Sequence, residues 1–213
     1  MTAEARPVTG LRERKKLRTR YAIISTAVTL FVERGYEETT VAEIAEAAEV
    51  APRTFFRYFA TKDEVALALI TETDEAFFRE LQTRPTGEPP VTALANAARA
   101  VVEQLMQADD GTGELWVRIQ WLLENSPPLL AAYFQRALSI EDRLARYLAE
   151  REGVDPTTDL RPFLAVGAVV TAVRAAHHQW STLPDGTSDD LLRLRDEALQ
   201  ALREPLDRHW ASA

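Results

Sequence analysis

The segment from residue 52 to residue 59, PRTFFRYF, combines cations, hydroxyl groups and aromatic rings within eight positions. Phe55 and Phe59 are four residues apart, so a helix places both on one face, where they can pack inward. Arg53, Thr54, Arg57 and Tyr58 fall off this apolar face, and Phe56 is ambiguous. A guanidinium can donate two parallel hydrogen bonds to O6 and N7 of guanine, which discriminates against other bases by about 1–3 kcal/mol. A helix that turns this polar face outward is therefore suited to reading DNA.

Two short predicted helices and a tight connection would hold that face in place. Thr40 and Glu43 form a capping-box pattern, which opens the first of these helices. Pro52 suits the first position of the second helix, after a turn of three residues. A longer helix precedes both, from about residue 11 to residue 34. Helices of these lengths around a tight turn are typical of a helix-turn-helix, whose second helix enters the major groove of DNA.

The rest of the chain is also predicted to be helical. Ala, Leu, Glu and Arg dominate it, and no stretch shows the sustained alternation of a β-strand. A second capping box, Thr61-x-x-Glu64, starts a long helix through about Leu81, and five further helices follow, the last from about Ser188 to Arg203. The expected fold is therefore all-α, with a three-helix N-terminal helix-turn-helix domain followed by six helices.

The charge is divided unevenly along the chain. The whole sequence has a net charge of −8, which by itself argues against binding to nucleic acid. Residues 1–62, however, carry 11 basic and 8 acidic side chains, whereas residues 63–213 carry 14 and 25. The N-terminal part is thus suited to approach phosphates, and the acidic remainder should stay away from the duplex.

Composition excludes several classes of chemistry. The chain has no Cys, its three His do not have metal-ligand spacing, and it contains no glycine-rich phosphate loop, so neither a metal nor a cofactor is expected. The longest apolar run, residues 163–173, is too short to span a bilayer, and the N-terminus lacks the apolar core of a signal peptide. We therefore expect a cytoplasmic protein without a membrane partner.

Polar residues on two of the apolar C-terminal helices are candidates for the wall of a pocket, because a mostly apolar cavity needs a few polar anchors. The candidate ligand-binding residues are Trp116, Arg118, Trp121, Arg174, His177 and His178. The alternative is that the tryptophans belong to the core and that the arginines pair with surface carboxylates.

A combined pattern across the N-terminal helices resembles the DNA-binding domain of the TetR family of transcriptional regulators, over roughly residues 15–65. The matching string is Phe31-x-x-x-Gly35-Tyr36-x-x-Thr39-Thr40-Val41-x-x-Ile44-Ala45-x-x-Ala48-x-Val50-x-x-x-Thr54-Phe55-Phe56-x-Tyr58-Phe59-x-x-Lys62. The resemblance implies a homodimer that binds double-stranded operator DNA, and a larger C-terminal domain that binds a small-molecule effector and supplies the dimer interface. The implied domains are a flexible arm at 1–10, the helix-turn-helix domain at 11–62, and the ligand-binding and dimerisation domain at 63–213.

The resemblance also assigns roles to individual residues. It implies phosphate contacts for Thr40, Tyr58 and Lys62. The full set of candidate DNA-binding residues is Arg18, Thr40, Pro52, Arg53, Thr54, Phe56, Arg57, Tyr58 and Lys62. The sequence departs from many relatives at Ala51, where a Ser commonly caps the recognition helix, so that Pro52 must help to define the start of this helix.

In the family the last two helices pair with those of a second copy. Residues 163–173 and the stripe Leu191, Leu194, Ala198 and Leu202 are similar to such an interface, although each could instead belong to the core of one protomer. The RTFFRYF run and the tryptophan-rich middle are also similar to actinobacterial regulators grouped with acyl-CoA responders, including those near mycofactocin clusters. The effector would then be an acyl-CoA or another hydrophobic metabolite.

These observations favour a ligand-responsive repressor, with no catalytic residue, that binds a palindromic operator as a homodimer and is released by a small molecule. An activator of the same family remains open, because the position of the operator relative to the promoter decides between the two. A helical enzyme with its site in the C-terminal domain and a purely structural interaction module are the alternatives from other classes.

Overall fold

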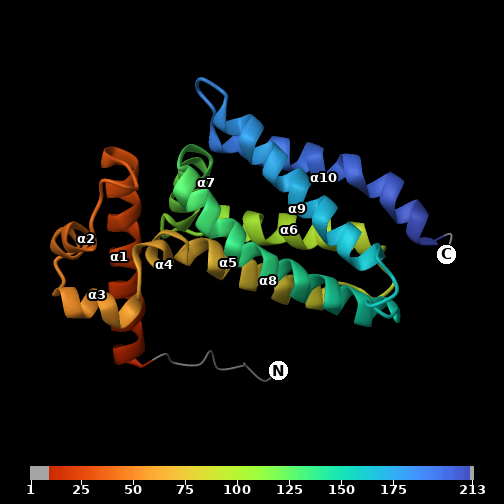
Figure 1. The fold of residues 1–213 in the computed structure, drawn as a ribbon, viewed down its shortest axis with the longest axis horizontal. Coiled ribbons are helices and arrows are strands. Elements are labelled where there is room, and N and C mark those ends of the chain that lie inside the picture. Colours follow the sequence, from red (N-terminus) through yellow and green to blue (C-terminus); the bar gives the residue numbers. More distant parts are fainter. Residues whose placement is uncertain (1–9, 212–213) are drawn as a thin grey trace, which may run out of the picture. The chain divides into compact units, whose positions relative to one another are not determined.

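The computed structural model describes residues 10–211, and it describes side-chain surroundings as far as residue 202. The described range contains ten α-helices and no strand, which confirms the all-α fold (Figure 1). The helices are α1 (Leu11–Arg34), α2 (Val41–Ala47), α3 (Pro52–Tyr58), α4 (Lys62–Ala66), α5 (Ala68–Thr83), α6 (Pro90–Met106), α7 (Thr112–Asn125), α8 (Pro127–Glu152), α9 (Arg161–Ser181) and α10 (Ser188–Ala211). The arm expected at residues 1–10 lies, except for Gly10, outside the described residues.

The contacts divide the chain into two compact units, Met1–Ala68 and Leu69–Ala213. In the first unit α1 packs against α2 and α4, and α2 packs against α3. Phe31, Ile44 and Phe55 are almost completely buried, and Phe59 is 3% exposed. The two phenylalanines that the helical spacing directs inward therefore do belong to the core of this unit.

The described residues form ten helices where the sequence predicts nine. The single helix expected from Thr61 to Leu81 is divided at Leu67, where the backbone dihedral angles (φ −95°, ψ 4°) are no longer those of an α-helix. The Leu67 N–H still donates a hydrogen bond to the carbonyl of Asp63 at 2.9 Å, so Leu67 is the C-cap of the short helix α4. The last helix is also longer than predicted, because it continues to Ala211 and not to about Arg203.

In the second unit α9 packs against α6, α7, α8 and α10, and α10 lies along α9 (Figure 1). A shared apolar core joins α6, α8, α9 and α10 with the end of α5, formed among others by Leu81, Leu94, Leu144, Leu148, Val166, Val169 and Leu199. Within the described part of the chain, no helix is long and apolar enough to cross a membrane.

Candidate functional site

The outward face of α3 presents cations and an aromatic ring. Arg53 and Arg57 are exposed, Thr54 and Tyr58 are half-buried, and Phe56 exposes 56% of its surface. Phe56 packs edge-on against the buried Phe55, with 5.5 Å between ring centroids. The phenylalanine that the sequence leaves ambiguous therefore lies on the same outward surface as the two arginines.

The turn before α3 fixes the direction of this face. Glu49 adopts a left-handed backbone (φ 54°), which reverses the chain after α2, and the Val50 N–H bonds to the Ala45 carbonyl at 2.9 Å. At Ala51 no side-chain cap is present, as the sequence indicates, and Pro52 occupies the start of the helix. The turn is thus set by backbone hydrogen bonds and a proline.

A basic groove of about 470 Å³ runs between α1 and the end of α3. Its walls are formed by Arg12, Glu13, Lys15, Lys16, Thr19, Arg57 and Tyr58. The Arg57 guanidinium lies 5.2 Å from the centre of the Tyr58 ring. Arg18 is exposed on α1 but does not line the groove. Several cations around one concave surface are suited to hold a phosphate backbone.

Thr40 caps α2. Its hydroxyl accepts a hydrogen bond from the Glu43 N–H at 3.2 Å and donates one to Glu43 Oε2 at 2.7 Å, and the Thr40 N–H donates to the same carboxylate oxygen at 2.8 Å. These hydrogen bonds, first of all the one from the backbone of Thr40, lower the pKa of Glu43. The capping box predicted from the sequence is therefore present, and the exposed Thr40 stands at the N-terminus of α2.

Lys62 is directed toward protein carbonyls and not outward. Its ammonium donates to the carbonyls of Tyr36 at 2.7 Å, Thr39 at 3.1 Å and Glu37 at 3.3 Å. The nitrogen also lies 4.4 Å from the centre of the Tyr36 ring. Since an ammonium has three donors, this arrangement differs from the expected phosphate contact, and it ties the loop between α1 and α2 to α4.

The Lys62→Met variant is expected to lower the free energy of unfolding by about 2 kcal/mol, because partly buried carbonyls lose a charged donor. Urea denaturation measures this change, and Lys16→Met, which removes an exposed cation of α1, is the matched control. An unchanged urea midpoint, together with a weaker salt dependence of DNA binding, would instead support the phosphate contact.

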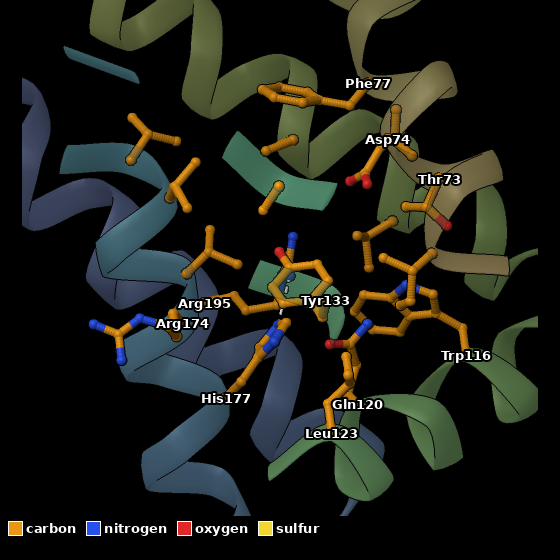
Figure 2. Close-up of a pocket in the computed structure, with 18 of the residues that line it drawn as sticks. Thr73, Asp74, Phe77, Trp116, Gln120, Leu123, Tyr133, Arg174, His177 and Arg195 are labelled. Atoms are coloured by element: carbon orange, nitrogen blue, oxygen red, sulfur yellow. Dashed lines mark hydrogen bonds between the residues drawn. The ribbon is translucent and has the colours of Figure 1, made fainter. Parts of the chain in front are cut away.

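The second unit contains a cavity of about 130 Å³ between α5, α6, α7, α8, α9 and α10 (Figure 2). Its walls are mainly apolar, with Phe77, Val101, Leu123, Val169 and Val173 among the lining residues. Polar groups project into this apolar lining from several helices. A concave, mainly apolar space with a few polar groups is the usual form of a small-molecule site.

Three of the six predicted pocket residues line the cavity, namely Trp116, Arg174 and His177. Arg118, Trp121 and His178 do not line this cavity, so the structure does not bring them together with the other three. Helical phase explains the difference, since each residue advances the side chain by about 100°. In α7 the residues that line the cavity include Trp116, Gln120 and Leu123, which share one face of the helix. Arg118 and Trp121 lie on another face and are exposed.

The side chain of His178 is 71% exposed, and its Nδ1 lies 3.0 Å from the Glu124 carboxylate. Its neighbour His177, one position earlier on α9, is buried in the cavity wall. The two adjacent histidines therefore have different surroundings, and only His177 belongs to the cavity.

His177 and Arg195 form a buried polar contact. The Arg195 guanidinium donates to His177 Nε2 at 2.7 Å, so His177 must be neutral, with its proton on Nδ1. Burial first, and then the charge of Arg195, lower the pKa of His177 well below its usual value. Burial also lowers the pKa of Arg195 to about 10, which leaves it protonated at neutral pH. Trp116 lies against both, with its ring centroid 5.9 Å from His177 and 5.3 Å from the Arg195 guanidinium.

Acidic and phenolic groups complete the polar lining. Burial, followed by the charge of Glu75, raises the pKa of Asp74 to about 7. Burial also raises the pKa of Tyr133 and of Glu141. The charged and phenolic groups that line the cavity are therefore two guanidiniums, Arg174 and Arg195, the Tyr133 phenol, and three carboxyl groups, Asp74, Glu124 and Glu141, of which Asp74 is only partly ionised at neutral pH.

Arg195, Asp74 and Tyr133 are not among the residues predicted from the sequence. The sequence could have indicated that Arg195 is buried, because this residue lies within the apolar stripe of the last helix, four positions after Leu191. Asp74 likewise follows Ile70 by four positions on an inward face. In this chain the two charges within apolar stripes, Arg195 and Asp74, line the cavity, whereas Arg118 beside the tryptophans is exposed.

A helix-turn-helix unit with an outward basic face, joined to a helical unit with a cavity, defines the class of effector-regulated DNA-binding proteins. Comparison with known families agrees with this class. The family of bacterial regulatory proteins named tetR matches residues 23–69, and the MftR C-terminal domain matches residues 88–207. The chain belongs to the TetR family of transcriptional regulators, as the sequence resemblance predicts.

Individual relatives place the chain within that family. It is 44% identical to the HTH-type transcriptional regulator TcmR of Streptomyces glaucescens over 203 residues, which cover 94% of this chain and 90% of TcmR. It is 24% identical, over 78% of this chain and 82% of the relative, to a Mycobacterium tuberculosis protein described as the mycofactocin biosynthesis transcriptional regulator MftR. These relatives are regulators of transcription and not enzymes.

Solved structures share the fold. NalD of Pseudomonas aeruginosa, the secondary repressor of a multidrug efflux pump, is 20% identical with a TM-score of 0.58, over 92% of this chain and 96% of NalD. FadR of Thermus thermophilus, a repressor solved with lauroyl-CoA, is 28% identical with a TM-score of 0.50, over 87% of this chain and 93% of FadR. Regulators of the TetR family bind operator DNA and small-molecule effectors, and this chain is a transcriptional regulator of that family.

Proposed function

We propose that this chain is a cytoplasmic repressor that binds a palindromic operator as a homodimer and is released when a small molecule enters the cavity of the second unit. The observation that carries this proposal is the presence, in one chain, of an outward basic recognition face and a mainly apolar cavity with buried polar groups. The ligand would favour one of two dimer geometries, and release would follow because these geometries differ in their affinity for DNA.

In the DNA complex, α3 would enter the major groove and the basic groove beside α1 would hold the phosphate backbone. Arg53 and Arg57 are the candidates for base contacts, because both are exposed on the outward face of α3. The cations of α1, together with Tyr58, would contact phosphates. The two copies of α3 would lie about 34–36 Å apart, one turn of DNA.

The Arg57→Ala variant is expected to bind the operator about 5- to 150-fold more weakly, and to lose preference at one base pair of each half-site, because a bidentate contact to guanine is worth about 1–3 kcal/mol. Fluorescence anisotropy with single-base operator variants measures both effects. The Lys16→Ala variant, by contrast, should weaken binding equally for all sequences and reduce the salt slope by about one. Unchanged affinity and base preference in Arg57→Ala would remove Arg57 from the recognition surface.

The dimer interface is proposed on the exposed face of α9. The predicted stripe on the last helix belongs largely to the core of one protomer, since Leu191 is 0% exposed and Leu194 is 7% exposed. On α9, Leu164 exposes 64% of its surface, and Leu160, which precedes the helix, exposes 69%. Gly167, Ala168, Thr171 and Ala175 continue this line of exposed or half-exposed small residues along α9. Small side chains on such a face allow a second copy of α9 to approach closely.

Two classes of effector are compatible with this proposal, acyl-CoAs and smaller hydrophobic metabolites. The similarity to FadR, which was solved with lauroyl-CoA, favours an acyl-CoA, whose acyl chain would suit the apolar walls. A smaller hydrophobic metabolite would occupy the existing space. Both classes would act by the same release of DNA.

A mobility-shift assay with the protein's own upstream region tests the proposal. The wild-type protein should shift this DNA, and one member of a panel of small metabolites and acyl-CoAs should abolish the shift. Retention of the shift with every compound that binds the protein would contradict effector-controlled release. Transcription from the bound promoter in vitro distinguishes repression from activation.

A further inference from the structure

Arg195 is a buried cation without an acidic partner. It exposes only 7% of its surface and lines the cavity from α10. Among the described residues, no carboxylate lies within 4.0 Å of its guanidinium, and the contact that it does make is to neutral His177. Its neighbour Asp196 is bonded instead to Arg99, at 2.8 Å.

The three acidic residues that line the cavity, Asp74, Glu124 and Glu141, form no ion pair with Arg195, and Glu124 contacts His178 instead. Asp74 belongs to α5, and its charge acts on Tyr133 but is not among the charges that act on Arg195. The ionised form of Asp74 is favoured by Arg136 and Arg143 of α8, and not by Arg195. Burial outweighs these charges and raises the pKa of Asp74 to about 7. The charge of Asp196 acts on Arg195, but burial outweighs it, and among the described residues no carboxylate forms an ion pair with this guanidinium.

A guanidinium held in this way leaves donors free toward the cavity. Arginine has five N–H donors, and His177 accepts one of them. Removal of a charged group from water costs several kcal/mol unless an opposite charge or sufficient hydrogen bonds replace the water. Trp116 adds a second unused donor, because its buried indole Nε1 has no hydrogen-bond partner among the described residues. Both donors belong to residues that line the same cavity.

The size and walls of the cavity limit what can accept these hydrogen bonds. Its volume of about 130 Å³ is close to that of an engineered apolar cavity in another protein, about 150 Å³, which holds one benzene molecule. Most of the remaining lining residues are apolar, with Phe77, Val101 and Val173 among them. The space therefore suits one ring or a short branched chain, and not the bulk of a coenzyme A headgroup.

We infer that the effector is a compact organic acid, whose anionic oxygens pair with Arg195 and whose single ring or short chain fills the apolar part of the cavity. This inference rests on the proposed function, because it assigns the chemistry of the same site. The Tyr133 hydroxyl is placed to give a further hydrogen bond to the anion, and the Trp116 indole can donate to a second acceptor of the ligand. The ligand thus supplies the counter-charge that the chain lacks.

The test uses benzoate as the acidic probe and benzamide as its neutral isostere, with binding to the full-length protein measured by isothermal titration calorimetry at neutral pH. Wild-type protein should bind benzoate at least tenfold more tightly than benzamide. Arg195→Met, which keeps the length of the side chain and removes the charge, should abolish this preference. Arg195→Lys should retain it in part, and Arg118→Met, which removes an exposed arginine outside the cavity, should retain it fully.

Several results would overturn the inference. These are equal binding of benzamide and benzoate by the wild type, an intact preference for benzoate in Arg195→Met, and binding of lauroyl-CoA with no binding of benzoate. If Arg195→Met does not fold, the comparison of wild type with Arg195→Lys and Arg118→Met still decides, because loss of the preference in Arg118→Met would place the anion elsewhere.

A second measurement separates this inference from the proposed function. The same preparations are titrated with a DNA duplex that the wild-type protein selects from a random pool. If benzamide or lauroyl-CoA releases this duplex while benzoate does not, the regulator function holds and the organic-acid inference fails. If the wild type selects no duplex, the proposed function itself fails, whatever benzoate does.

Discussion

Replacement of Gly167 by glutamate is expected to convert the proposed dimer into monomers and to weaken operator binding at least about 100-fold, because linked binding to two half-sites contributes a factor of about 10²–10⁴. Gly167 lies in the middle of α9, on the partly exposed face that includes Leu164 and Ala168. Apart from its own helix backbone and chain neighbours, a Cβ atom added there meets no atom of the described residues within 4 Å. In a dimer through this face, however, two glutamates would meet close to the symmetry axis, and their charges would be buried without partners.

The same substitution should not harm the protomer. Glycine in a helix interior costs about 0.8–1.0 kcal/mol relative to alanine, and glutamate is among the better helix formers. Thermal unfolding of the monomer should therefore show an intact helical fold. Gly87→Glu is the matched control, since this exposed glycine lies in the loop before α6 and also has no atom within 4 Å of an added Cβ.

Analytical ultracentrifugation and anisotropy with the operator duplex measure the two effects. The Gly87→Glu protein should remain a dimer and bind DNA as the wild type does. A Gly167→Glu protein that remained a dimer with unchanged affinity would show that the interface lies on another face of the second unit.

The Asp74→Asn variant is expected to stabilise the second unit at alkaline pH by about 4 kcal/mol, and to have little effect at pH 3. Burial raises the pKa of Asp74 to about 7, whereas its value in an unfolded chain is near 3.8. The folded state therefore binds more protons than the unfolded state between these two values. The stability that this proton contributes is fully present below pH 3.8 and is lost as the pH rises to 7.

Asparagine reproduces the neutral form of the carboxyl group at every pH. The difference in unfolding free energy between Asp74→Asn and the wild type should therefore grow from pH 4 to pH 7 and then remain constant. Urea denaturation at a series of pH values measures it, and Asp185→Asn, a change at an exposed carboxyl in the loop before α10, should show no comparable growth. A difference that does not depend on pH would mean that Asp74 is ionised throughout this range.

The N-terminal unit follows closely from the sequence because its signals are local. The Thr40 capping box, the proline at the start of α3 and the four-residue spacing of Phe55 and Phe59 each act within one or two helical turns. Each of these features is present in the structure. Lys62 differs because its partners lie more than 20 residues earlier, in a loop whose carbonyls no local pattern reveals.

The cavity could be predicted only in part, since it depends on the rotation of six helices about their axes. Trp116 and His177 line it, but their neighbours Arg118 and His178 do not, although the sequence gives both members of each pair equal weight. The inward direction of Arg195 follows from the packing of α10 on α9. Contacts between helices distant in sequence decide that packing. A pattern within α10 therefore reveals its apolar stripe, but it does not reveal that Arg195 within this stripe lines a cavity.

The most direct test of the proposed function is a titration of the full-length protein against its selected operator duplex and against the same duplex with scrambled half-sites. We expect two protomers for each palindrome, an affinity for the operator at least about 10³-fold above that for the scrambled duplex, and release of the operator by the compound that fills the cavity. Equal affinity for the two duplexes, or an operator affinity that no cavity ligand changes, would contradict a ligand-responsive repressor.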